Sequence, residues 1–108
     1  MIIAGEDAIA IRKKAKDNNA KLPTVLIVED NNELRRHLAS DLQDDYDIKE
    51  AANGSKGLKI AKKIFPDLII SDVMMPKMDG FELCKEIKKD FDTCHIPVLL
   101  LTARSLDN

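Results

Sequence analysis

Residue types that would point to several classes of protein are scarce in this sequence. Tryptophan is absent, and the aromatic residues are one tyrosine and three phenylalanines, so the core must be aliphatic. The two cysteines, Cys84 and Cys94, are ten positions apart and offer neither a disulfide framework nor the closely spaced ligands of a structural zinc site. We therefore interpret them, together with His95, as ordinary helix and loop residues.

Neither charge of one sign nor a long apolar run dominates the chain. The 17 lysines and arginines nearly balance the 19 aspartates and glutamates, which leaves no basic footprint for nucleic acid. The longest apolar runs, such as Val25 to Val28 and Val98 to Leu101, have four residues, whereas a membrane span needs about 18. Because Met1 does not begin a secretory signal either, we predict a cytoplasmic chain that contacts neither nucleic acid nor membrane directly.

The residue pattern divides the chain into a leader and one domain. Residues 1–22 are rich in alanine and lysine and predict a helical leader or linker. In residues 23–108, short β-rich apolar runs alternate with segments of helical periodicity. The expected strands are residues 24–28, 46–51, 67–72 and 97–102. This alternation predicts an α/β domain with a doubly wound parallel sheet and helices on both faces.

Each of the three expected helices carries a stripe of side chains that we predict to be buried. Asn31 is placed to cap the first helix, Gly54 opens the second, and Pro66 stops it. The predicted stripes, helix by helix, are Leu34, Leu38 and Leu42; Leu58, Ala61 and Phe65; and Phe81, Cys84, Ile87 and Phe91.

Polar side chains stand at the carboxyl ends of the expected strands. Glu29 and Asp30 end the first strand, Asp72 ends the third, and Thr102 ends the fourth. In open α/β folds these strand ends meet at one edge, where ligands bind. Three carboxylates held together repel one another unless a cation joins them, and an oxygen-only cluster suits Mg²⁺. Such a cluster can also leave one carboxylate to act as a nucleophile toward a phosphoryl group.

The segment after Asp72 has an unusual composition. It contains three methionines, a proline and an Asp-Gly pair, at Met74, Met75, Pro76, Met78, Asp79 and Gly80. The proline and an Asp-Gly turn favour a tight surface loop over a core segment. A loop of this kind can hold a backbone carbonyl on a metal ion.

Three motifs, in this order, resemble the receiver domain of two-component response regulators. They are Val25-Leu26-Ile27-Val28-Glu29-Asp30, the run from Pro66 to Gly80, and Ile96-Pro97-Val98-Leu99-Leu100-Leu101-Thr102-Ala103. The resemblance extends from Leu22 to Asn108. It implies the flavodoxin-like (CheY-like) doubly wound sheet with strand order 2-1-3-4.

The resemblance also implies a role for each residue of the predicted site. Asp72 is implied to be the phosphoacceptor, which takes a phosphoryl group from the phosphohistidine of a histidine kinase. The implied ligands of Mg²⁺ are Glu29, Asp30, Asp72 and the backbone carbonyl of Met74. Thr102 is implied to bind the phosphoryl group and to act as the switch, and the loop-shaping residues are Pro76, Asp79 and Gly80. A domain of this kind phosphorylates and dephosphorylates itself but is not a turnover enzyme.

The segment from Phe65 to Ala103 is also similar to receivers within hybrid two-component proteins of Bacteroides-like bacteria. In such proteins a sensor histidine kinase precedes the receiver, and a helix-turn-helix domain that regulates transcription follows it. This similarity implies a kinase partner in cis or in trans and makes residues 1–22 the linker from a kinase. The domain would then belong to the cytoplasmic part of a protein that is either free or anchored in a membrane.

The family pattern continues beyond the last expected strand with a helix, a strand that ends in a phosphoryl-binding lysine, and a final helix. We find no counterpart of them, and because neither Lys56 nor Lys77 stands at the matching position, no residue receives that role. The domain is therefore expected to be incomplete at its C-terminus, with an apolar last strand at a sheet edge that invites pairing. We expect a homodimer, a segment exchange, or a leader helix over residues 4–16 to cover it.

Three other functions agree with part of the sequence. A phosphorylation-independent interaction module would keep the receiver fold without the switch, and the missing lysine favours it for this chain, though not for a longer parent protein. A phosphatase or phosphomutase with an aspartyl nucleophile usually has a second acid two residues further on, where this chain has Met74. A flavin-binding flavodoxin would need a Ser/Thr/Gly-rich phosphate loop after the first strand, where this chain is acidic.

Overall fold

The computed structural model describes residues 21–101, in which four strands alternate with three helices. The strands are β1 (Thr24–Val28), β2 (Asp47–Ala51), β3 (Leu68–Asp72) and β4 (Val98–Leu101). The helices are α2 (Asn32–Leu42), α3 (Gly54–Ile64) and α4 (Gly80–Lys89). The α/β class and the expected order of elements are confirmed, with small shifts at the ends of individual elements.

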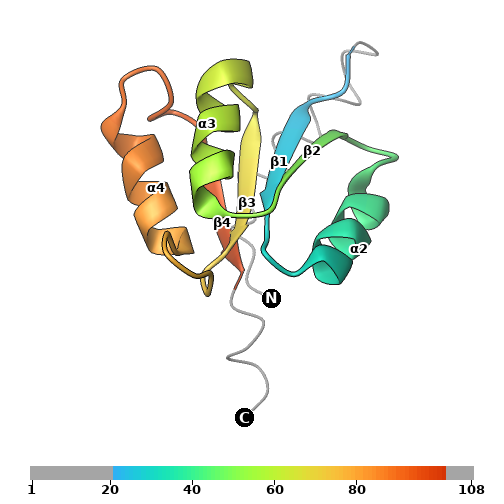
Figure 1. The fold of residues 1–108 in the computed structure, drawn as a ribbon. Helices are drawn as coiled ribbons and strands as arrows, with labels where there is room; N and C mark the ends of the chain where they lie inside the picture. The colour runs from blue at the N-terminus through green and yellow to red at the C-terminus, as the bar shows by residue number, and fades with distance from the viewer. Residues whose placement is uncertain (1–20, 102–108) are drawn as a thin grey trace.

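The four strands form one parallel sheet in the predicted order β2-β1-β3-β4. From β1 the chain first moves outward to β2 and then crosses back to place β3 on the other side of β1 (Figure 1). Such a reversal is the topological switch point, where open α/β sheets bind their ligands. Because Val28 pairs with Ser71, the next residues, Glu29 and Asp72, lie beside each other at this point.

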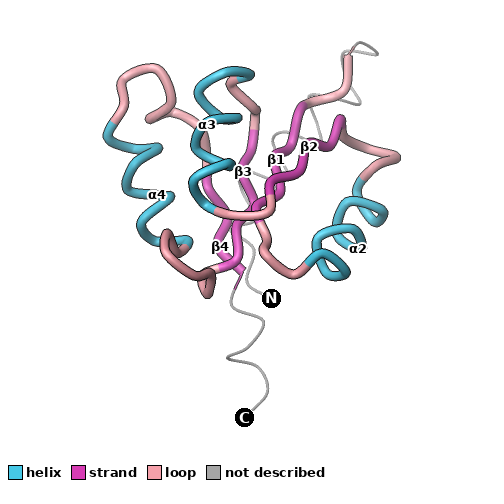
Figure 2. Tube along the Cα trace, viewed as in Figure 1, coloured by secondary structure: helices cyan, strands magenta, loops and turns pink. Residues whose placement is uncertain are grey.

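Helices cover both faces of the sheet. In Figure 2, α3 and α4 lie on one side of the strands and α2 lies on the other. The core accordingly has two parts, both largely aliphatic, and Tyr46 is its one aromatic member among the described residues. The part beneath α3 and α4 consists of Leu26, Val28, Ala51, Ala61, Ile69, Met75, Leu83, Ile87 and Ile96. The part on the α2 side consists of Val25, Ile27, Leu38, Tyr46, Leu68, Ile70, Leu99 and Leu101.

The predicted leucine stripe of α2 is confirmed. Leu38 is buried, and Leu34 and Leu42 pack against the same part of the core. The predicted cap is confirmed as well, since Oδ1 of Asn31 accepts a hydrogen bond from the backbone N–H of Leu34 at 2.9 Å. This cap fixes where the chain turns from β1 into the helix.

Three phenylalanines that were predicted to be buried are exposed instead. The exposed fractions are 49% for Phe65, 62% for Phe81 and 90% for Phe91. Helix α4 buries Leu83 and Ile87, so its core-facing stripe is rotated away from Phe81, and the helix ends before Phe91 is reached. Phe65 caps the C-terminus of α3 in a left-handed conformation, with φ of 50°, and its backbone N–H donates to the carbonyl oxygen of Ala61.

The edges of the described sheet are β2 and β4, as predicted. The leader helix expected over residues 4–16 lies outside the described residues. The homodimer and the segment exchange therefore stay predictions. Within residues 21–101, no helix has both the length and the apolar character that crossing a membrane requires.

Candidate functional site

The site begins at Glu29, the first residue after β1. Its side chain is almost completely buried, with 1% exposed, and its backbone N–H donates to the carbonyl oxygen of Ala51 at 3.1 Å. Oε2 accepts a hydrogen bond from the backbone N–H of Asn31 at 2.9 Å. Oε1 is buried and has no hydrogen-bond partner within the described part of the chain. A buried acceptor oxygen without a donor is costly, unless an ion or a proton joins it.

Asp72 is the last residue of β3 and is 7% exposed. Its Oδ1 accepts a hydrogen bond from the backbone N–H of Met74 at 3.3 Å. The backbone N–H of the next residue, Val73, still donates to the carbonyl oxygen of Leu101 at 3.1 Å, so Asp72 lies within the sheet at its carboxyl edge. The strand itself therefore places the predicted acceptor at the switch point.

The structure brings the three predicted acids together. One carboxylate oxygen from each of Glu29, Asp30 and Asp72 can be chosen so that all three lie within 4.8 Å of one another. Oδ1 of Asp30, like Oε1 of Glu29, is buried without a hydrogen-bond partner in residues 21–101. The cluster thus combines three carboxylates with two orphaned acceptor oxygens, which is the donor set that a hard divalent cation binds.

Burial and negative charge both act on Glu29. Removal from water raises its pKa from 4.5 to about 7, and the carboxylates of Asp30 and Asp72 add to the rise. The hydrogen bond from the backbone of Asn31 acts in the opposite direction. Without a cation, Glu29 therefore holds a proton over part of the neutral pH range. A bound cation would favour the ionised form.

The loop after Asp72 is shaped by the start of α4. Asp79 caps this helix, since its Oδ1 accepts from the backbone N–H of Glu82 at 2.8 Å, and the Glu82 side chain bonds back to the N–H of Asp79. The predicted Asp-Gly turn is therefore wrong, because this pair begins a helix. The left-handed residue of the loop is Lys77, with φ of 68°.

Gly80 is required by a close approach of the backbone. A Cβ atom at this position would lie 2.4 Å from the carbonyl oxygen of Asp72. The missing side chain allows the first turn of α4 to pack directly against the end of β3. Gly80 thereby fixes the distance between the α4 cap and the acid cluster.

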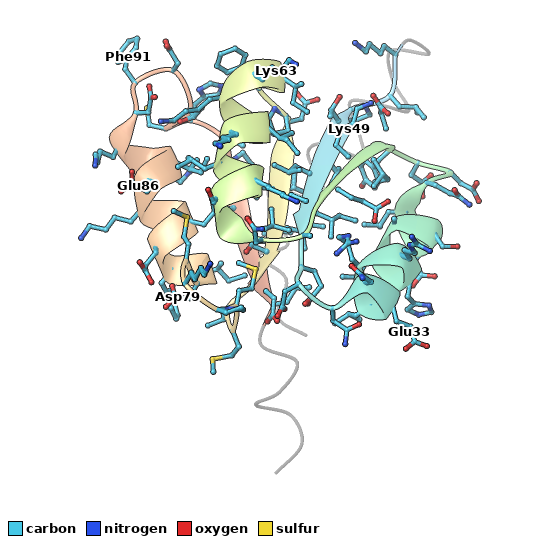
Figure 3. All side chains as sticks on the ribbon, viewed as in Figure 1. Glu33, Lys49, Lys63, Asp79, Glu86 and Phe91 are labelled. Carbon is cyan, nitrogen blue, oxygen red and sulfur yellow. The ribbon has the colours of Figure 1, made fainter. Side chains whose placement is uncertain are left out.

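A hollow of about 340 Å³ lies beside the cluster. It is lined by Asp30, Met74, Met75, Pro76 and Asp79. Met74 is exposed, but Met75 is buried in the core and Met78 packs against it, so the expected surface loop contributes two of its three methionines to the interior. Glu33, near the start of α2, and Asp79 lie at the end of the molecule where the carboxyl ends of the strands lie. Phe91 and Lys63 lie at the opposite end (Figure 3).

Two further residues complete the account of the site. Thr102, the predicted switch residue, lies outside the described residues. Arg35, which the sequence did not single out, bonds the carbonyl oxygen of Glu29 at 2.8 Å. Helical periodicity is the sequence signal that separates it from Arg36, because it places Arg35 at the border of the stripe of Leu34, Leu38 and Leu42 and places Arg36 on the opposite, exposed face.

Comparison with known proteins gives consistent matches. The family model for the response regulator receiver domain matches residues 25–108. Histidine kinase P4 of Formosa agariphila is 50% identical over 100 residues, which cover 93% of this chain and 7% of the kinase. Hybrid signal transduction histidine kinase D of Dictyostelium discoideum is 39% identical over 95 residues, which cover 88% of this chain and 6% of that protein. The chain therefore spans less than a tenth of the length of these two relatives.

Solved structures agree with these matches. The N-terminal domain of a response regulator receiver protein from Methanoculleus marisnigri superposes with a TM-score of 0.73 at 37% identity, over 77% of this chain and 68% of that one. The receiver domain of a signal transduction histidine kinase from Syntrophus aciditrophicus gives a TM-score of 0.71 at 39% identity, over 79% of this chain and 71% of that one.

Proposed function

Because the chain belongs to the response regulator receiver family, as its motifs predicted, we propose that it accepts a phosphoryl group on Asp72 in a reaction that requires Mg²⁺. The proposed donor is the phosphohistidine of a histidine kinase. One observation carries the proposal, namely the cluster of Glu29, Asp30 and Asp72 at the switch point between β1 and β3. Three carboxylates this close repel one another, so the arrangement is costly unless a cation joins it.

The proposed ligands of Mg²⁺ are Glu29, Asp30, Asp72 and the backbone carbonyl of Met74. The orphaned oxygens of Glu29 and Asp30 support this set, because both are buried and both lack a donor in the described residues. Mg²⁺ binds through a few oxygen ligands and keeps positions for water and phosphoryl oxygens. When bound, it would neutralise charge on the transferring phosphoryl group. Glu29 must release its proton first, since its pKa is about 7.

Asp72 is the proposed nucleophile. The N–H of Met74 holds Oδ1, which leaves Oδ2 as the attacking oxygen. Oδ2 forms a bond to phosphorus while the bond from phosphorus to the histidine nitrogen breaks. The electron pair of the broken bond stays on the imidazole, which takes up a proton from solvent. The products are an aspartyl phosphate and an unphosphorylated histidine.

The remaining roles are proposed from the family resemblance. Thr102 would bind a phosphoryl oxygen and shift the domain from its inactive to its active form. Pro76, Asp79 and Gly80 would shape the loop beside the acceptor. The cap that Asp79 places on α4 and the close approach at Gly80 support the last two assignments.

We propose that this domain works within a larger signalling protein that contains a histidine kinase and an output domain that regulates transcription. Two of the relatives described above are named as histidine kinases, one of them hybrid. A third, the DNA-binding dual master transcriptional regulator RpaA of Synechocystis, is 40% identical over 83 residues, which cover 76% of this chain and 34% of that protein.

Phosphorylation of the full chain by acetyl phosphate, followed by intact-mass spectrometry, tests the function. We expect a single phosphoryl group that appears with Mg²⁺ and is absent with EDTA. Asp72→Asn should abolish it, because the amide oxygen is a poor nucleophile. Asp92→Asn, an equivalent change at an exposed residue in the loop after α4, should leave it unchanged.

Labelling that survives Asp72→Asn would refute the assignment of the acceptor. A folded wild-type chain that stays unlabelled, by acetyl phosphate and by a phosphorylated kinase alike, would favour the phosphorylation-independent interaction module.

A further inference from the structure

Arg35 connects three parts of the chain around the acid cluster. It lies in the first turn of α2, and its side chain is 11% exposed. Nη1 donates to the carbonyl oxygen of Glu29 at 2.8 Å, and Nη2 donates to Oδ1 of Asn32 at 2.7 Å. Nε donates to Oε1 of Glu50 on β2 at 3.2 Å. Each donor nitrogen of the guanidinium group therefore has a separate acceptor.

These contacts act on the short loop that carries two of the three acids. The loop runs from the end of β1 to the start of α2, and its backbone also holds Oε2 of Glu29 through the N–H of Asn31. Arg35 holds the backbone carbonyl of Glu29 in the same loop. Repulsion among the carboxylates favours movement of this loop away from Asp72, and the hydrogen bonds of a planar guanidinium oppose that movement.

We propose that Arg35 is a positioning residue for the divalent-ion site. It touches none of the proposed ligand oxygens. It holds the backbone from which Glu29 and Asp30 project, so that their carboxylates are gathered before the ion arrives. This inference rests on the proposed function, since it assumes that the cluster binds a divalent cation. Partners that orient metal ligands in this way commonly contribute tenfold or more to affinity.

Because Arg35 is positively charged, the direction in which its removal changes Mg²⁺ affinity distinguishes a charge effect from a positioning effect. A guanidinium near a cation site repels the cation, so the loss of its charge alone would strengthen the binding of Mg²⁺. The salt bridge to Glu50 reduces this repulsion. Loss of the positioning role would weaken binding instead. The two roles of Arg35 therefore predict opposite changes in the dissociation constant.

The test compares Arg35→Met with Arg36→Met in the full chain. Both changes remove one positive charge and keep an unbranched side chain, but Arg36 is exposed on the same helix. Binding of Mg²⁺ is measured by calorimetry and binding of Mn²⁺ by electron paramagnetic resonance. We expect Arg35→Met to weaken binding of both ions by about tenfold. Arg36→Met should leave it within about twofold, as expected for an exposed charge.

A second readout follows the loop itself. The amide resonance and hydrogen exchange of Asn31 report on the bond from its N–H to Glu29. In the absence of metal, Arg35→Met should shift this resonance and speed its exchange, while amides at the opposite end of the sheet stay unchanged. A general loss of stability would speed exchange throughout the molecule and would count against a positioning role.

Arg35→Lys covers the case in which Arg35→Met does not fold. Lysine keeps the charge but lacks the planar fork, so it cannot serve three separate acceptors in the same geometry. We expect it to weaken Mg²⁺ binding by an intermediate amount. If the wild type binds Mg²⁺ and the folded Arg35 variants bind it equally well or more tightly, the positioning role of Arg35 is overturned and the proposed function is not. A wild type that binds neither ion would overturn the proposed function as well.

Discussion

Glu29 is buried away from water, and the carboxylates of Asp30 and Asp72 lie beside it. Burial is the largest cause of its raised pKa, and the neighbouring carboxylates add to it. The side chain is nevertheless held in place, because one oxygen accepts from the backbone of Asn31. Burial therefore makes the ionised form of this fixed carboxyl costly.

Without metal, the free energy of unfolding should fall as the pH rises through the neutral range. The native pKa of Glu29 is about 7 against an ordinary value of 4.5, so between these values the native state keeps a proton that the unfolded state has released. The stabilising contribution of the Glu29 carboxyl is complete below pH 4.5 and is lost as the pH rises through about 7. A shift of this size corresponds to a loss of up to about 3 kcal/mol.

Urea unfolding in EDTA, followed by circular dichroism at about pH 5 and about pH 8, measures this loss. Glu29→Gln is the matched control, since its amide does not titrate and has nearly the same shape. The change in unfolding free energy between the two pH values should be smaller in this variant, because the contribution of Glu29 is missing from it. An unchanged difference would show that other groups cause it.

Gly80→Ala should destabilise the domain even though alanine is the better helix former. Its Cβ would meet the carbonyl oxygen of Asp72 at 2.4 Å, and a backbone atom of β3 cannot move aside cheaply. We expect a loss of about 1–3 kcal/mol in unfolding free energy. Ser55→Ala, at an exposed position in the first turn of α3, provides the comparison and should be close to neutral. A stabilised Gly80→Ala variant would contradict the close packing.

At the scale of elements, the cap of α4 connects the loop to the helix. Asp79→Ala removes the acceptor for the N–H of Glu82 and should cost about 1 kcal/mol. Asp79→Asn keeps a capping oxygen and should retain most of the stability. Thermal unfolding of the two variants measures the contrast. Equal losses would mean that the charge of Asp79, and not its hydrogen bond, stabilises the helix.

The elements also show what could be predicted from the sequence. Strands β1, β3 and β4 were predictable because buried strands are apolar runs, β2 because its residues alternate, and α2 because leucines recur every four residues with no competing stripe. In α4 the burial of Ile87 was predicted correctly, but the rest of the stripe was not, because Phe81 and Phe91 are larger apolar candidates than the Leu83 that the helix buries. The start of α4 is fixed by the capping box at Asp79, where the Asp-Gly pair had suggested a turn.

The convergence of the acids was predictable for a simpler reason. The ends of parallel strands meet at one edge whatever the details of side-chain packing, so Glu29, Asp30 and Asp72 had to approach one another. The hydrogen bond from Arg35 to Glu50 depends instead on how α2 lies against β2, since the two residues are fifteen positions apart along the chain. The periodicity of residues within one helix does not predict a contact with a residue on a different element.

At the scale of the whole molecule, the site joins the two halves of the sheet. Glu29 and Asp30 extend from β1, which pairs with β2, and Asp72 extends from β3, which pairs with β4. An ion held by all three would connect the helix layers through the sheet between them (Figure 1). Its binding energy would therefore stabilise the fold against global unfolding as well as the loop.

Magnesium should raise the free energy of unfolding by about 1.4 kcal/mol for each tenfold increase in concentration above its dissociation constant. The concentration at which this rise begins should depend on pH, because the ion must displace the proton of Glu29, whose pKa is about 7. About one tenth of this carboxyl is ionised near pH 6 and about nine tenths near pH 8, so the onset should lie about tenfold higher at the lower pH. Urea unfolding over a series of Mg²⁺ concentrations at both pH values measures the slope and the onset. Asp30→Asn should lose the slope, and an onset that stays the same at both pH values would show that Glu29 does not exchange its proton for the ion.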